Sequence, residues 1–125
     1  MRKAINPPGA AAPTSPYSPA IAQNGFVFVS GQGPLDPRTG DYKPSDIQTE
    51  TKQAFENIKA ILEAAGSSMD KVVKVNVYLR AIGDFKAMNE VYATYFTAPY
   101  PARTTIQAGA LPRNFAVEIE CVAAA

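Results

Sequence analysis

The chain has 125 residues, of which 46% are hydrophobic and 18% charged, a composition typical of one globular domain. Twelve Lys and Arg balance eleven Asp and Glu, and the resulting formal charge of +1 argues against binding to nucleic acid or to a membrane surface. No apolar run approaches the ~20 residues of a membrane span, and the N-terminal segment lacks the apolar core of a signal peptide, so we expect a cytoplasmic protein.

The residue types that the chain lacks exclude several classes of chemistry. There is no histidine, and Cys121 is the one cysteine. Without histidine the chain has no Ser-His-Asp or Cys-His arrangement and no zinc site of the usual His-containing kind. One cysteine forms no intrachain disulfide, which fits a reducing compartment. The groups left for chemistry are carboxylates, Arg, Lys, Tyr, hydroxyls and the backbone.

The first part of the chain is predicted to be extended. Residues 1–20 hold five of the 11 prolines, which disfavours helix there. Residues 25–31, GFVFVSG, are β-branched and aromatic between glycines and predict a strand. Turn-forming residues follow, and a loop is expected over 36–40.

Two amphipathic helices and one strand are predicted in the middle of the chain. Ser45 or Asp46 can cap the first helix, which Gly66 ends. Its apolar face comprises Ile47, Thr51, Ala54, Phe55, Ile58, Ile61 and Leu62. Residues 70–80 then alternate as a strand, whose shared side comprises Val73, Val75, Val77 and Leu79. Asp84 is expected to cap the second helix, whose apolar face comprises Phe85, Met88, Val91, Tyr92, Tyr95 and Phe96.

Two final strands are predicted over 103–107 and 116–123, joined by a turn-rich segment around Pro112. The expected order is therefore strand, strand, helix, strand, helix, strand, strand. The sequence contains no internal repeat and no linker between blocks of different composition. Residues 1–125 are thus expected to form one domain with a Pro-rich lead-in.

The strand over 25–31 carries apolar side chains on both faces. Phe26 and Phe28 point one way and Val27 and Val29 the other, so both faces of the sheet require burial. Two helices cover only one face of a sheet, and a domain of this size buries only about two-thirds of its surface by itself. We predict that an oligomer covers the second face, and the alternative is that the Pro-rich lead-in covers it.

Two carboxylates alternate with apolar side chains in the segment VEIEC. Glu118 and Glu120 share one face of the predicted strand, about 7 Å apart, and Val117, Ile119 and Cys121 share the other. Such a pair is typical of a solvated strand face as well as of an acid-base site. Cys121 is interpreted as a small buried hydrophobe rather than a nucleophile, because it lies on the apolar face.

Arg103, at the start of a predicted strand, is the second candidate for chemistry. A turn about Pro112 would make the last two strands an antiparallel hairpin. In that register Arg103 lies opposite Glu120, and Thr105 lies opposite Glu118. A guanidinium matches a ligand carboxylate bidentately, so Arg103 is either the anchor of an acid substrate or a structural salt-bridge partner.

Seven segments, taken together and in order, resemble the Rid (YjgF-type) family over nearly the whole chain. They are SPYSPA at 15–20, FVFVSGQGPLDPRTG at 26–40, QAFENIKAILEAAG at 53–66, VVKVNVYL at 72–79, DFKAMNEVYATYF at 84–96, PARTTI at 101–106 and VEIECVA at 117–123. The resemblance implies an α+β, chorismate-mutase-like fold, in which two helices pack on one face of a mixed sheet and three chains form a homotrimer. The trimer would bury the second face and place the ligand sites in clefts between subunits.

The resemblance also implies roles for particular residues. Arg103 would anchor a substrate carboxylate, and Glu120 would orient or activate water. The residues that would line the pocket are Tyr17, Ser30, Gly31, Asn89 and Thr105. The best-known branch of the family often has Cys where this chain has Thr105, a difference that bears on substrate preference. We expect that the protein needs neither a metal nor a cofactor.

The best-known branch of the family hydrolyses reactive enamine and imine acids, such as 2-aminoacrylate, 2-iminopropanoate and 2-iminobutanoate, to 2-keto acids and ammonia. We expect this reaction here, because Arg103 and Glu120 are both present. The alternatives are a related hydrolase or deaminase with another substrate, and a noncatalytic module that binds small carboxylates or a protein partner in the same cleft. RNA cleavage is disfavoured, because the chain has neither a basic run nor a histidine.

Overall fold

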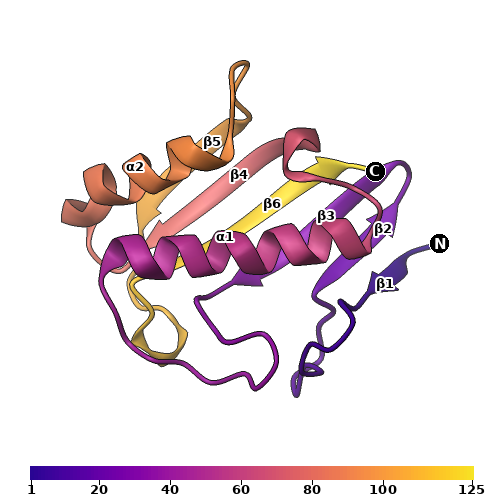
Figure 1. The fold of residues 1–125 in the computed structure, drawn as a ribbon, viewed down its shortest axis with the longest axis horizontal. Coiled ribbons are helices and arrows are strands. Elements are labelled where there is room, and N and C mark those ends of the chain that lie inside the picture. Colours follow the sequence, from indigo (N-terminus) through magenta and orange to yellow (C-terminus); the bar gives the residue numbers. More distant parts are fainter.

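One mixed sheet forms the frame of the computed structural model, which describes residues 1–125 (Figure 1). Its six strands follow the order β1-β2-β3-β6-β4-β5, and every neighbouring pair is antiparallel except β4 and β5. The strands are β1 (Lys3–Ile5), β2 (Ala20–Gln23), β3 (Phe26–Gln32), β4 (Val72–Leu79), β5 (Ala102–Gln107) and β6 (Val117–Ala124), and the helices are α1 (Ile47–Ala64) and α2 (Phe85–Tyr95). Three strands precede α1, one more than predicted, because part of the Pro-rich lead-in forms β1.

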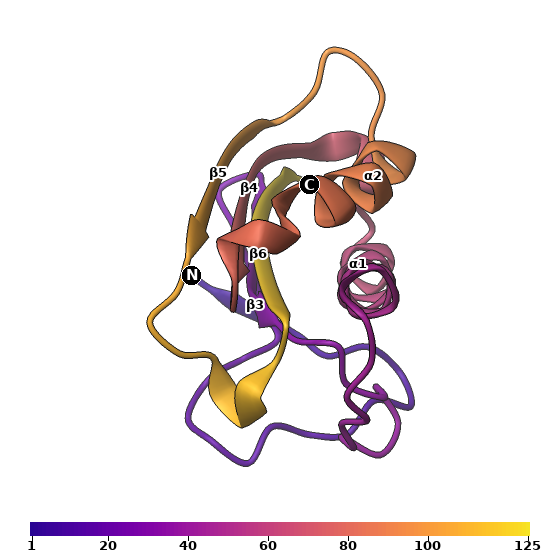
Figure 2. The ribbon, with the colours of Figure 1, turned by 90° about the vertical axis from the view of Figure 1, so that its left-hand side faces the viewer.

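Both helices lie on the same side of the sheet (Figure 2). Asp46 caps α1, and its Oδ1 accepts a hydrogen bond of 2.8 Å from the backbone N–H of Thr49. Gly66 follows the helix end with φ of 78°, a conformation that glycine adopts without strain. α2 begins at Phe85 after a short 3₁₀ turn, and the predicted cap Asp84 makes no side-chain capping bond. Neither helix is long and apolar enough to cross a membrane.

The core fills the space between the helices and the sheet face beneath them. It includes Ala54, Phe55, Ile58, Ile61 and Leu62 of α1, Val75, Val77 and Leu79 of β4, and Val117, Ile119 and Cys121 of β6. The predicted alternation of β4 fails at its start, because a bulge lies between Val72 and Lys74. Val72 is therefore buried and Val73 is exposed, although the alternation predicts Val73 for the core.

The last two strands do not form the hairpin predicted from the turn-rich segment. β5 pairs with β4 in parallel, and β6 lies between β3 and β4. α2 makes the crossover from β4 to β5, which is the type of connection that a parallel pair requires. Because this crossover places β5 at the sheet edge, the inner side of β4 stays free for β6.

The sheet face away from the helices is uncovered in a single chain. On β3, Phe26 is 43% exposed and Phe28 is 48% exposed, and Ile106 of β5 is exposed as well. The lead-in leaves these side chains open, because its strand β1 extends the sheet by pairing with the edge of β2. The alternative that the lead-in covers this face is therefore wrong, and an apolar surface remains available to another chain.

Candidate active site

Arg103 and Glu120 lie on opposite faces of the sheet. Arg103 is in register with Val75 of β4, and Val75 is in register with Cys121 of β6. Val75 and Cys121 are buried beneath the helices, so Arg103 points to the helix side. Glu120 is in register with Asn76, one position along, and points the other way. The prediction that Arg103 and Glu120 lie side by side in one hairpin is therefore wrong, because β4 separates their strands.

Arg103 is held by side chains of α2. Its Nη1 donates a hydrogen bond of 2.6 Å to Asn89 Oδ1. Its guanidinium carbon lies 4.4 Å from the ring centroid of Tyr92 and 5.4 Å from that of Phe85, both within the range of cation–π attraction. Thr105 follows on the same side of β5, and its buried Oγ1 has no hydrogen-bond partner. The structure thus brings together Arg103, Asn89 and Thr105, with Asn89 as the partner of the arginine.

Glu120 lies on the uncovered face and is fixed by two donors. Its Oε1 accepts hydrogen bonds from Asn76 Nδ2 at 2.9 Å and from the Tyr78 hydroxyl at 3.0 Å. Both bonds go to Oε1, and Oε2 accepts no hydrogen bond within the chain. Burial, and then the hydrogen bond to Glu120, raise the pKa of Tyr78, so this phenol stays a donor near neutral pH. Phe28 and Lys74 border the same hollow, whose volume is about 210 Å³.

Ser30 and Gly31 form the neighbouring part of this face. Ser30 Oγ donates a hydrogen bond of 2.6 Å to the carbonyl of Ser18, which ties the lead-in to β3. A side chain at Gly31 would collide with the carboxylate of Glu118, so glycine lets that carboxylate approach the backbone. Burial, and then the charge of Glu120, raise the pKa of Glu118. Glu118 belongs to this part of the site although it was not among the predicted pocket residues, and its alternation with Glu120 was the available signal.

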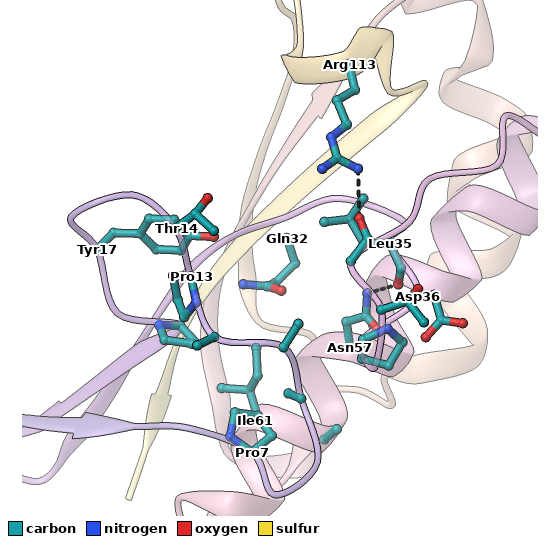
Figure 3. A pocket seen from close by; sticks show the side chains of 18 residues that line it. Pro7, Pro13, Thr14, Tyr17, Gln32, Leu35, Asp36, Asn57, Ile61 and Arg113 are labelled. Atoms are coloured by element: carbon teal, nitrogen blue, oxygen red, sulfur yellow. Dashed lines mark hydrogen bonds between the residues drawn. The ribbon is translucent and has the colours of Figure 1, made fainter.

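Tyr17 lies apart, at a cavity of about 300 Å³ between the lead-in, α1 and the loop that follows β3 (Figure 3). Its ring is 56% exposed, and it stands on the opposite side of the cavity from Asn57. Gln32, between them, donates a hydrogen bond of 3.1 Å from Nε2 to the carbonyl of Ser30. Within one chain the predicted residues therefore fall into three groups, around Arg103, around Glu120 and at Tyr17. No group of three His, Cys, Asp or Glu side chains could hold a metal ion.

Cys121 is expected to be inert towards thiol reagents in the folded protein. It is buried, and burial raises the pKa of its thiol to about 12, so the reactive thiolate is scarce and inaccessible. Titration with a chromogenic disulfide at about pH 8 should give no reaction under native conditions and one thiol per chain in denaturant. A fast native reaction would contradict the interpretation of Cys121 as a core side chain.

The fold and its side chains define the class, a small α+β protein with one mixed sheet and two helices on one face. The model of the family described as endoribonuclease L-PSP matches residues 8–125. A RutC family protein of Pyrococcus horikoshii is 48% identical over 98% of both chains, and the 2-iminobutanoate/2-iminopropanoate deaminase of Mus musculus is 43% identical over 98% of this chain and 91% of its own. The structure of the Rid family protein YyfA from Yersinia pestis matches with a TM-score of 0.95 and 39% identity over 100% of both chains. The chain belongs to the Rid (YjgF-type) family.

Membership confirms the resemblance found in the sequence. The mixed sheet with two helices on one face agrees with the solved Rid structures as well. The homotrimer and the roles of the individual site residues stay predictions at this point.

Proposed function

We propose that this protein hydrolyses reactive 2-imino acids and their enamine tautomers, including 2-aminoacrylate, 2-iminopropanoate and 2-iminobutanoate, to 2-keto acids and ammonia. The relative from Mus musculus, 43% identical, is named as a deaminase of two of these imines. The observation that carries the proposal is that Arg103 has no acidic partner within the chain. Its guanidinium donates one hydrogen bond, and the acceptor is the neutral side-chain amide of Asn89. Such an arginine is suited to a carboxylate that comes from outside the chain.

The two halves of the site meet between chains in this proposal. Arg103 and Glu120 point away from opposite faces of one sheet, so one small substrate contacts both only if they belong to different copies. The exposed phenylalanines of β3 supply the apolar contact that holds the copies together. We therefore assign the functional unit as a homotrimer, in which Arg103, Asn89 and Thr105 of one subunit face Ser30, Gly31 and Glu120 of the next.

The proposed reaction depends more on the positions of the substrate and the attacking water than on a strong base. Arg103 fixes the substrate carboxylate, and Oε2 of Glu120 accepts a proton from the attacking water. The water oxygen bonds to the imine carbon, and Glu120 returns the proton to the nitrogen, which gives a carbinolamine. The C–N bond then breaks, the hydroxyl proton leaves with the nitrogen as ammonia, and the carbonyl of the keto acid forms. In this proposal the backbone N–H of Gly31 and the exposed side chain of Tyr17 also contact the substrate. No metal or cofactor takes part in these steps.

The test is an assay coupled to a pyridoxal-phosphate enzyme that releases 2-aminoacrylate or a 2-imino acid. We expect the imine to disappear faster than in the uncatalysed reaction, with keto acid and ammonia formed in equal amounts. An uncatalysed rate from a folded, trimeric protein would contradict the proposal. It would favour the alternatives, a Rid hydrolase with a different substrate or a module that binds small carboxylates or a protein without turnover.

The assembly is tested by one charge on the uncovered face. Phe28→Asp places an unpaired carboxylate in the proposed contact, where burial would cost several kcal/mol, so we expect the particle mass in light scattering to fall from three chains to one. Lys59→Asp, on the exposed side of α1, is the control and should stay trimeric. A wild-type protein that runs as a monomer would contradict the assembly.

The description of the family model raises RNA cleavage as a second activity to check. The chain offers a formal charge of +1 and no histidine, so it lacks the usual electrostatic attraction for phosphates and the usual base for ribonuclease chemistry. We expect no degradation of single-stranded RNA under the conditions of the imine assay.

A further inference from the structure

Three side chains of α2 surround the guanidinium of Arg103. Phe85, Asn89 and Tyr92 are spaced by four and three residues, so they share one edge of the helix. We call these three residues the arginine clamp. Tyr92 contributes the closest ring at 4.4 Å from the guanidinium carbon, Phe85 a second at 5.4 Å, and Asn89 Oδ1 accepts the hydrogen bond from Nη1 at 2.6 Å.

Tyr92 acts in this cluster through its ring. The side chain is 6% exposed, and its buried hydroxyl has no hydrogen-bond partner. An orphaned buried hydroxyl destabilises a fold, so the hydroxyl is not what makes this residue useful here. Its ring face, in contrast, lies beneath a cation and is screened from water, where cation–π attraction is strongest.

The clamp uses part of the guanidinium and leaves a defined part free. Asn89 Oδ1 accepts a hydrogen bond from Nη1, and the guanidinium carbon lies over the Tyr92 ring. The edge formed by Nε and Nη2 makes no hydrogen bond within the chain, and this edge is one that a planar carboxylate engages with both oxygens.

We propose that Tyr92 is a positioning residue, whose ring holds the Arg103 guanidinium so that its Nε–Nη2 edge receives a planar carboxylate. The inference rests on the proposed function for the ligand and extends it, since it assigns the selection of carboxylates to a residue that does not itself touch the ligand. Lysine at position 103 cannot satisfy the same clamp, because an ammonium has neither a planar face to stack nor a bidentate edge.

Binding of 2-oxobutanoate, the keto acid of the proposed reaction, tests the clamp independently of turnover. Titration calorimetry on the intact trimer compares wild type with Tyr92→Phe and Tyr92→Leu. Phe55→Leu is the matched control, because Phe55 packs against Tyr92 with ring centroids 5.6 Å apart and belongs to the same buried aromatic cluster. Phe85→Leu is a milder change, because that ring is partly exposed and its loss leaves the core intact.

We expect Tyr92→Leu to weaken 2-oxobutanoate binding about tenfold, Phe85→Leu about threefold, and Tyr92→Phe less than twofold. Phe55→Leu should lower the thermal midpoint as Tyr92→Leu does, with binding unchanged. The methyl ester, which is neutral and has no carboxylate for a bidentate contact, should bind weakly to every variant alike. If Tyr92→Leu does not fold, the threefold effect of Phe85→Leu decides the matter.

Three results with the variants, and one with the wild type, would overturn the clamp. The first is wild-type affinity for 2-oxobutanoate in Tyr92→Leu or, if that variant does not fold, in Phe85→Leu. The second is that Phe55→Leu weakens binding as much as Tyr92→Leu does. The third is that Tyr92→Phe binds as weakly as Tyr92→Leu. A wild-type protein that does not bind 2-oxobutanoate overturns it too. Saturable binding without imine turnover counts against the proposed deamination alone, so the two failures are distinguishable.

Discussion

In the proposed function, Arg103→Ala is expected to remove most of the imine hydrolysis while the protein keeps its fold and its proposed trimeric assembly. The arginine lies on an edge strand, and its contacts within the chain are with α2 side chains, so its removal leaves the core intact. Removing one partner of a desolvated, bidentate charge pair costs about 2–5 kcal/mol, which corresponds to a loss of roughly 30- to several-thousandfold in kcat/KM. No other effect of a single substitution on activity is expected to be larger.

The measurement is kcat/KM in the coupled assay beside circular dichroism and light scattering. Arg80→Ala is the matched control: Arg80 is exposed after the end of β4, and its Nη1 donates to the carbonyl of Asn114, away from Arg103. That variant should retain wild-type kcat/KM. Full activity in Arg103→Ala would remove the carboxylate anchor from the proposal.

The second large effect is the recovery of activity expected in mixed trimers of the proposed assembly. Arg103→Ala and Glu120→Gln are each expected to be inactive, yet trimers containing both kinds of chain should recover activity. A site is intact where its arginine comes from a Glu120→Gln chain and its glutamate from an Arg103→Ala chain. With equal amounts and random assembly this holds at about one interface in four, so about one quarter of the wild-type rate should return.

The two variants are denatured together, refolded and assayed, with each variant refolded alone as the control. Restored activity requires the two groups of one site to come from different chains. A mixture as inactive as its components, from trimers shown to contain both kinds of chain, would place both groups of a site in one chain and contradict the proposed assembly.

Local patterns in the sequence predict most of the elements. The helical spacing of the apolar residues and the cap at Asp46 identify α1, and the alternation in VEIEC assigns Glu118 and Glu120 to one face and Cys121 to the other. These predictions succeed because each depends on a few neighbouring residues and on one burial preference.

The partner of β5 depends on the whole chain, and there the prediction fails. A turn-rich segment between two strands fits a hairpin as well as a connection that crosses the sheet, and periodicity does not distinguish them. The pairing of β5 with β4 determines that Arg103 and Glu120 point to opposite faces of the sheet. The prediction that Val73 is buried fails for the same reason. The bulge that exposes Val73 arises where β4 pairs with β6, a strand that is remote in sequence.

Asn89 makes a different contact from the one predicted for it, which was to line the ligand pocket. The family pattern identifies the residue, but its contact is with the arginine rather than with an open pocket. Tyr92 was predicted as part of an apolar helix face, and its role toward Arg103 requires the position of β5, which the helical pattern does not contain.

If the proposed trimer forms, the placement of Arg103 and Glu120 on opposite faces makes the number of complete sites depend steeply on the amount of protein. If each site needs more than one chain, a newly made chain has no activity until it meets others. At low abundance the number of complete sites then rises as about the third power of the free chain concentration. A modest change in synthesis or degradation is thereby amplified into a much larger change in catalytic capacity, without an effector or a modification.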